Sequence, residues 1–446
     1  MSHRSVLLWI LCLWTASSVF YELWTVEGHW WTASLADKVH ASRHLMETDS
    51  DIAGYLLPGL NQKPTLLSTL DWWHTSWAGG PQVPFWRPLT SLGFWLEYHA
   101  FSSERVDRWM AVTAVCHLLF LALLVVFTQR LTQRWWLGVL AVLLFAGERA
   151  LLIRCLPPDC RTVYAALDMA ATPAAMALQN WKDQPEMWAG ACILGAVILA
   201  CDRRWVWALA CAFAAVCFKE SGWLVFPLSG VALWSRSQLR TVPHCVWVWA
   251  AVLILGLVVL RAWAGPAVFA GYHYGHNGHW WPRYFHQAGG CYLLFLTMTT
   301  SAGGVVLGTL LFVILRFWRR SLATGMVVAA AAIAIAAALQ SRWCGGDFVA
   351  GLVCLLDWNE GLLCVVQSFL WLWLAFSLWK NRPYRRSAAA LLLMDLLACA
   401  VVAAASQVTL HALYLALAFQ STLVSVPLAL CFKRAVGLRS LPSTGL

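Results

Sequence analysis

Charged side chains are scarce in this chain: Asp, Glu, Lys and Arg make up 12% of its 446 residues, whereas apolar residues make up 61%. A water-soluble domain carries about twice that share of charge, so an ordinary globular arrangement in water is excluded. A long basic cluster is also missing, although the formal net charge is +10. The basic residues stand in small groups between apolar runs, so we expect no nucleic-acid partner.

Apolar residues occur in runs of about 15 to 25, the length that a helix needs to cross a bilayer. Because a backbone in lipid must satisfy its own hydrogen bonds, the runs predict an all-α, polytopic transmembrane helix bundle of about twelve segments. The first run covers residues 5–24 and is either a cleaved signal peptide or, as we favour, an uncleaved first helix. The other runs cover residues 109–128, 136–152, 186–201, 205–218, 221–234, 243–262, 292–315, 322–340, 362–379, 387–406 and 408–432.

Basic groups between the runs predict the orientation, because Lys and Arg concentrate in short cytoplasmic loops. If Arg4 is cytoplasmic and the runs are counted in order, every basic group falls on the cytoplasmic side. We therefore expect a multi-pass integral membrane protein with both termini in the cytoplasm. In a bacterium this would be the plasma (inner) membrane. The groups lie at residues 130–134, 203–204, 236–240, 316–320, 380–386 and 433–434. The predicted parts are a first transmembrane helix (1–24), an outer loop (25–108) and a bundle (109–446) with outer loops at 153–185, 263–291 and 341–361.

Two of the runs, 205–218 and 221–234, are too short for a comfortable span. The orientation requires them to turn at Lys219 and Glu220, toward the outer side. We therefore expect a short re-entrant pair, or half-spanning helices broken by Pro227, rather than two full spans.

The first outer loop contains a candidate general base. Asp49 and Asp51 precede Tyr55, and a carboxylate held just above the membrane can take a proton from an acceptor hydroxyl. The alternative is a pair of solvated helix-capping acids. Farther along the same loop, the segment 85–90 reads Phe-Trp-Arg-Pro-Leu-Thr and leads into an amphipathic stretch.

Three of these features together resemble a known family. An acidic residue with Tyr four positions on, the W-R-P-L-T segment at 86–90 and the K-E-S-G turn at 219–222 are similar to the GT-C class of polytopic glycosyltransferases. The likeness is to the protein O-mannosyltransferase-like branch and the membrane half of its tetratricopeptide-bearing relatives, and it covers residues 5–235. It implies transfer of a sugar from a polyprenyl-phosphate donor to an acceptor at the non-cytoplasmic face.

The resemblance also implies roles for residues. Where the family has Asp-Asp or Asp-Glu, this chain has Asp49-Ser50-Asp51, and we favour Asp51 as the base with Asp49 beside it. Arg87 and Lys219 are the candidates for binding the donor phosphate, because cations at membrane level need a functional partner. For Arg87 the alternative is snorkelling to lipid headgroups. Glu220 is a candidate substrate-loop residue.

A third outer loop carries His273, His276 and His279 at intervals of three. On a helix this spacing would suit a divalent metal ion, which is the one candidate cofactor. Gly275 and Gly278 disfavour a helix, so we expect a flexible loop that contacts substrate or headgroups.

Other features leave alternatives open. The function could instead be transport or flipping of a lipid-linked sugar, although a transporter should show broken helices in both halves and only one broken pair is evident. A catalytically inactive membrane scaffold is the third alternative. Cys155 and Cys160 flank a Pro-Pro bend and are predicted to form a disulfide on the outer side. Asp395 lies within an apolar run, where a carboxylate normally faces the bundle interior.

Overall fold

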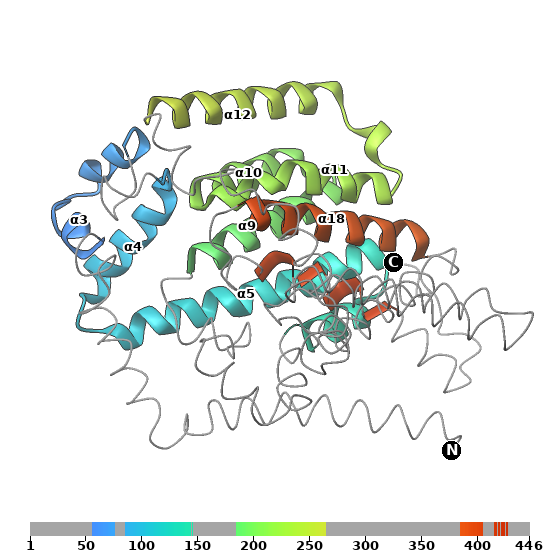
Figure 1. Ribbon diagram of the computed structural model, residues 1–446, viewed down its shortest axis with the longest axis horizontal. Helices are drawn as coiled ribbons and strands as arrows, with labels where there is room; N and C mark the ends of the chain where they lie inside the picture. Colours follow the sequence, from blue (N-terminus) through green and yellow to red (C-terminus); the bar gives the residue numbers. More distant parts are fainter. Residues whose placement is uncertain are drawn as a thin grey trace, which may run out of the picture.

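The computed structural model describes residues 56–75, 85–143, 145, 184–264 and 384–404, with short pieces between 414 and 426 (Figure 1). Every regular element within these ranges is a helix, which confirms the all-α prediction for this part of the chain. The main helices are α3 (Leu57–Asn61), η2 (Leu67–Trp73), α4 (Pro88–Phe101), α5 (Val106–Thr132), α9 (Gln184–Cys201), α10 (Trp205–Phe218), η4 (Glu220–Leu224), α11 (Val225–Ser235), η5 (Leu239–Thr241), α12 (His244–Trp263) and α18 (Arg385–Ala404).

Three of these helices, α5, α9 and α12, are long and apolar enough to cross a membrane, with 27, 18 and 20 residues. Helix α10 is apolar but shorter. Their bounds agree with the predicted runs to within a few residues, and α18 begins two residues before the predicted run 387–406 and is described to Ala404. The first predicted helix and the runs between 292 and 379 lie outside the described residues, so the number of about twelve spans stays a prediction.

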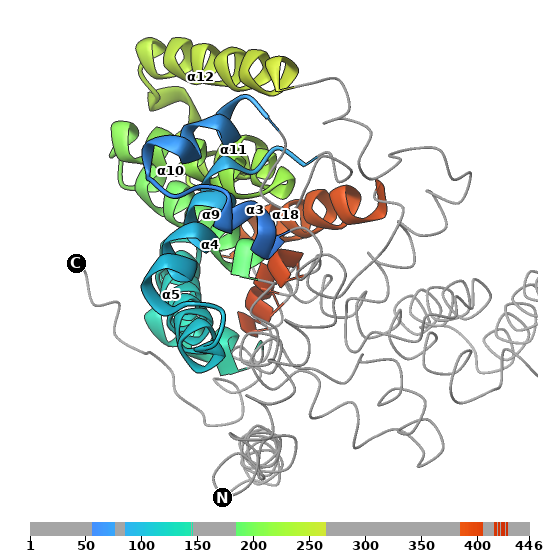
Figure 2. The same cartoon turned by 90° about the vertical axis from the view of Figure 1, so that its left-hand side faces the viewer.

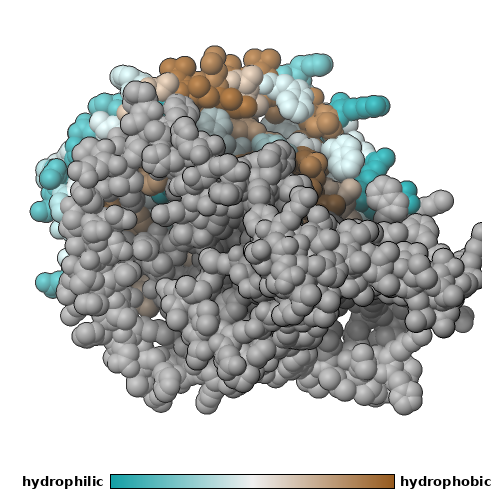
Figure 3. Space-filling view, in the orientation of Figure 1, coloured by the Kyte–Doolittle hydropathy of each residue, from teal (hydrophilic) through white to brown (hydrophobic). Residues whose placement is uncertain are grey.

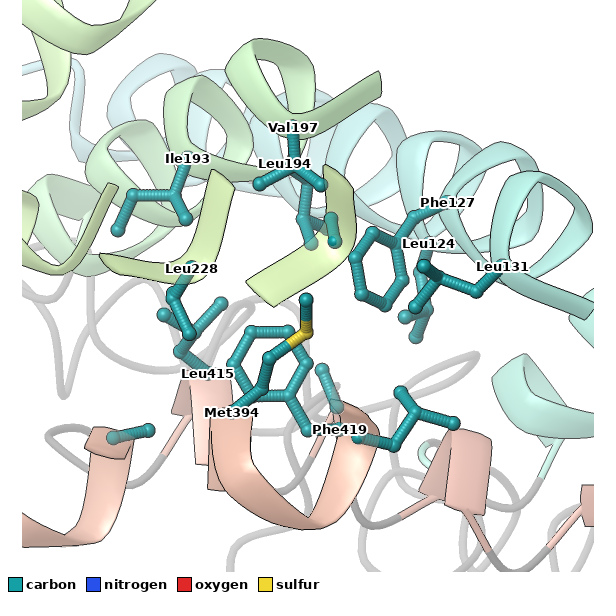
Figure 4. Packing of buried hydrophobic residues seen from close by; sticks show 14 of the residues in the cluster. Leu124, Phe127, Leu131, Ile193, Leu194, Val197, Leu228, Met394, Leu415 and Phe419 are labelled. Carbon is teal, nitrogen blue, oxygen red and sulfur yellow. The ribbon is translucent and has the colours of Figure 1, made fainter. Parts of the chain in front are cut away.

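Helices α5, α9, α10, α11 and α18 pack around one apolar core, seen from close by in Figure 4. Phe127 of α5, Val197 of α9 and Met394 of α18 are all buried in it. Lipid tails are as apolar as these side chains, so close contact rather than escape from water holds such helices together. Gly190 of α9 makes this contact possible, because a Cβ there would lie 2.9 Å from the ring of Phe120.

Helix α12 lies at the edge of the bundle in both Figure 1 and Figure 2. Only 11% of its most apolar window is buried, and most of its large apolar side chains are exposed, although Leu257 is buried. Figure 3 shows apolar side chains along the top of the molecule, where α12 lies in Figure 1. This face of α12 is suited to contact lipid tails.

Part of the predicted outer loop is folded against the start of α5. Leu60, Trp72 and Phe94 form a small cluster with Trp109 of α5. The indole N–H of Trp95 donates a hydrogen bond of 2.7 Å to the Lys63 carbonyl and joins the loop to α4. The described residues 56–75 and 85–109 are therefore structured, and their contacts fix α4 in place.

Several of the predicted basic groups meet at one end of the bundle, which we call the arginine-rich end. There α5 and α11 end and α18 begins. Arg130 pairs with Asp202 at N–O distances of 2.8 and 2.9 Å, and Arg236 donates a 3.0 Å hydrogen bond to the Arg130 carbonyl. Arg386 donates to Ser237. Basic groups that are far apart in the sequence thus lie at one end of the helix bundle. This agrees with the prediction that they face the same side of the membrane.

The short pair of helices turns where the sequence predicts. Helix α10 ends at Phe218, Lys219 is extended, and the 3-10 helix η4 leads into α11. The predicted break at Pro227 is wrong, because Pro227 is the third residue of α11 and the helix continues through it to Ser235. The first turn of a helix has no intrahelical use for its N–H groups, so proline costs nothing there. Asp395 is fully buried, as expected of a carboxylate that faces the interior.

Candidate functional site

A buried ion pair joins the two sequence segments that flank the site. Arg87 directly precedes α4, and Glu220 is the first residue of η4. The guanidinium Nε and Nη2 lie 2.9 and 2.6 Å from Oε2 of Glu220, and Nε lies 3.2 Å from Oε1. The two side chains are only 7% and 6% exposed. A planar guanidinium matched to a carboxylate in this way is held in one orientation.

The charge on this pair is stable. Burial by itself would raise the pKa of Glu220, but the Arg87 guanidinium and its hydrogen bonds, with the nearby Arg261, lower it below the usual range. The guanidinium of Arg87 also lies over the ring of Phe85, with its carbon 4.1 Å from the ring centre. Glu220 therefore stays ionised, and the site holds a permanent pair of opposite charges.

A second ion pair lies beside the first. The ammonium of Lys219 contacts the carboxylate of Glu186 in the first turn of α9. Their side chains are 12% and 7% exposed. Lys219 is the extended residue between α10 and η4. Arg87 and Lys219 are thus each paired with a different carboxylate.

Backbone contacts hold the two segments against each other. The hydroxyl of Thr90 in α4 donates a hydrogen bond to the Phe218 carbonyl at the end of α10. Gly222 lets η4 fold back on α10, because a Cβ at this position would lie 2.1 Å from the Ala215 carbonyl oxygen. The W-R-P-L-T and K-E-S-G segments, which carry the resemblance stated above, are therefore in direct contact.

Glu97 is a buried carboxyl that the sequence reading missed. Its Oε2 accepts a 3.2 Å hydrogen bond from the side-chain amide of Gln184, which also donates to Thr113 and to the Trp109 carbonyl. Burial raises the pKa of Glu97 to about 8, against the effect of the Gln184 hydrogen bond. The carboxyl is mostly protonated at neutral pH. Its signal in the sequence was a lone acid within the apolar stretch 92–98.

The predicted site residues are brought together only in part. Arg87, Lys219 and Glu220 lie in one cluster, where Glu186 was not anticipated. The burial and pairing of Arg87 are the opposite of a guanidinium that snorkels to headgroups. The remaining predicted residues lie outside the described part of the chain: Asp49, Asp51, His273, His276 and His279, together with the predicted Cys155–Cys160 disulfide.

The described cluster contains two ion pairs, and the buried Arg261 lies near Glu220 as a third cation. Within the described residues, no group of three or more His, Cys, Asp or Glu side chains is arranged to hold a metal ion. An anionic ligand would have to compete with Glu220 and Glu186 for the cations. No family model matches this chain, and no curated protein and no solved structure matches it.

Proposed function

We propose that this protein is a membrane glycosyltransferase of the GT-C type, which moves a sugar from a polyprenyl-phosphate donor to an acceptor at the non-cytoplasmic face. The observation that supports it best is the Arg87–Glu220 pair, because it brings together two segments that resemble the family independently. Arg87 and Glu220 are separated by 133 positions in the sequence. Buried charged residues in a membrane protein usually have a function, so a shared role is the simplest reason for the charged residues of both segments to meet in one place.

The proposed reaction needs a base and a stabilised leaving group. Asp51, with Asp49 beside it, takes the proton from the acceptor hydroxyl as its oxygen bonds to the anomeric carbon. The bond from that carbon to the phosphate oxygen breaks, and the phosphate leaves with the electron pair. Arg87 and Lys219 stabilise the charge that develops on it.

The two carboxylates have a positioning role in this proposal. Glu220 and Glu186 hold the cations in place inside the bundle before the donor arrives, so less side-chain ordering remains to be done when it binds. The donor phosphate then shares the cations with them. His273, His276 and His279 belong to a loop that contacts the substrate in this scheme.

Sidedness is part of the same proposal. The arginine-rich end faces the cytoplasm, as do both termini, and the Arg87 cluster lies toward the outer face. The lipid tail of the donor lies among the helices, and the acceptor enters from the aqueous side.

Replacing the base tests the proposal. Asp51→Asn keeps the size of the side chain but removes the base, so sugar transfer should fall by about a hundredfold or more. Asp49→Asn should have a smaller effect. The measurement is transfer from a radiolabelled polyprenyl-phosphate sugar in membranes that contain equal amounts of folded protein. Full activity of Asp51→Asn would refute the assignment of the base.

The same membranes separate the competing functions. A transporter or flippase would move the lipid-linked sugar between leaflets without cleaving it from its carrier. A scaffold would do neither. If the wild-type protein moves the carrier but never releases the sugar from it, the transferase proposal is wrong.

A further inference from the structure

A pocket of about 500 Å³ opens at the arginine-rich end, away from the Arg87 cluster. It lies where α5 and α11 end and α18 begins. Among the described residues, it is lined by Leu131, Thr132, Gln133, Ser235, Arg236, Arg385, Arg386 and Ser387.

The described residues that line this pocket carry charge of one sign. Three of these residues are arginines, and none of them carries a carboxylate. A carboxylate at the same end, that of Asp202, is engaged by Arg130 through two N–O distances of 2.8 and 2.9 Å. Three guanidiniums grouped in one wall favour an anion, and their planar donors suit phosphate oxygens.

Hydroxyl groups give the wall a second property. Ser387 donates its proton to the Leu131 carbonyl at 2.7 Å, and Ser235 donates to the Ala232 carbonyl at 2.8 Å. With their protons directed into the protein, these oxygens can serve a ligand only as acceptors. The wall therefore suits an anion that also carries hydroxyl groups.

The size and surroundings of the pocket indicate the source of such an anion. Its volume is that of a small-molecule site and exceeds what one inorganic phosphate fills. Trp234 is adjacent in sequence to the lining residue Ser235, Trp135 is two positions after Gln133, and the two tryptophans are 46% and 63% exposed. Exposed tryptophan at a helix end is typical of the membrane interface, where lipid headgroups lie.

We propose that this pocket binds a phosphate ester, supplied by the headgroup of an anionic phospholipid in the leaflet at the arginine-rich end. Basic pockets between transmembrane helices bind such headgroups through their phosphate. The ligand seated here contacts α5, α11 and α18 together and ties segments that are far apart in the sequence. This proposal is independent of the proposed transferase activity.

The test measures lipid binding to the full chain in detergent micelles by native mass spectrometry, with dioleoyl-phosphatidylglycerol as the probe. The variant Arg385→Gln with Arg386→Gln removes two charges from the pocket and leaves the hydrogen bond of Arg236 to α5 intact. The control, Arg204→Gln with Arg240→Gln, removes two charges near the same end from residues that do not line the pocket. The pocket variant should bind the lipid about thirtyfold more weakly, and the control by less than about threefold.

Other outcomes distinguish the sources and can overturn the proposal. Equal losses in the two variants would mean diffuse surface charge rather than a pocket, and equal binding of dioleoyl-phosphatidylcholine would exclude recognition of an anion; either result overturns it. If glycerol 3-phosphate displaces the lipid only at millimolar concentration, the phospholipid is supported as the source of the phosphate ester. If glycerol 3-phosphate itself binds tightly, and this binding is lost in the pocket variant only, the phosphate-ester site is supported and its ligand is a soluble one.

Discussion

Replacing Glu220 by Gln leaves the Arg87 guanidinium buried without its counter-charge. The pair is 6–7% exposed, with N–O distances of 2.6 to 3.2 Å, so neither group can turn to water when the other is lost. Removing one partner of a buried pair costs about 3 to 5 kcal/mol, because the remaining charge is desolvated and uncompensated. We expect Glu220→Gln to lower the free energy of unfolding by that amount.

A matched control exists within the same chain. Arg105 and Asp107 form a pair with N–O distances of 2.9 and 3.0 Å, but their side chains are 50% and 42% exposed. For Asp107→Asn we expect a loss of about 0 to 1 kcal/mol, because water solvates the remaining charge. Replacing both buried partners, as Arg87→Met with Glu220→Leu, should cost less than Glu220→Gln alone.

The measurement is reversible unfolding in mixed micelles by titration with SDS, followed by far-UV circular dichroism. The comparison uses the difference between each variant and the wild-type protein. If Glu220→Gln loses no more stability than Asp107→Asn, the Arg87–Glu220 pair is not desolvated in the membrane-embedded protein. The positioning role given to Glu220 would then be wrong.

Three further predictions concern the fold, the buried carboxyl and the orientation. Gly222→Ala should destabilise the protein by about 1 to 3 kcal/mol in the same SDS titration, because its Cβ would overlap the α10 backbone, whereas Gly230→Ala, with nothing within 4 Å, should not. The folded-state pKa of Glu97 is about 8 against an ordinary 4.5, so the folded protein holds a proton that the unfolded chain releases. The free energy of unfolding should therefore fall as the pH rises from about 5 to 8, and an unchanged slope in Glu97→Gln would contradict this. A probe cysteine within 25–108 should be labelled by an impermeant reagent from outside, and one beside Arg385 should not; the reverse labelling would invert the predicted orientation.

The transferase and transporter proposals predict different uses of the same polar cluster. A helix pair interrupted at Lys219, with ion pairs beside the interruption, is a feature that transporters also have. The contact between the two family-like segments favours the transferase. Because the helix arrangement is compatible with both proposals, the sugar-transfer activity of the Asp51→Asn variant is the better test between the transferase and the transporter.

The positions of the described helices were largely determined by the sequence alone. The run predicted at 205–218 is the observed extent of α10, and the turn at Lys219 lies where the basic groups required it. Length and hydropathy suffice for this because a chain in lipid must form its hydrogen bonds within each segment. Pro227 was misread as a break because proline interrupts a helix interior but not its first turn.

The pairing of charges was decided by the tertiary structure. Arg87 and Lys219 were recognised as unusual cations, yet nothing local indicated that Glu220 would meet the first and Glu186 the second. Glu97 and its Gln184 partner were missed for the same reason. Hydropathy places residues along a helix axis, but which side chains meet across the bundle depends on how closely the helices pack. At Gly222, two residues after Glu220, the packing of η4 on α10 leaves no room for a single Cβ.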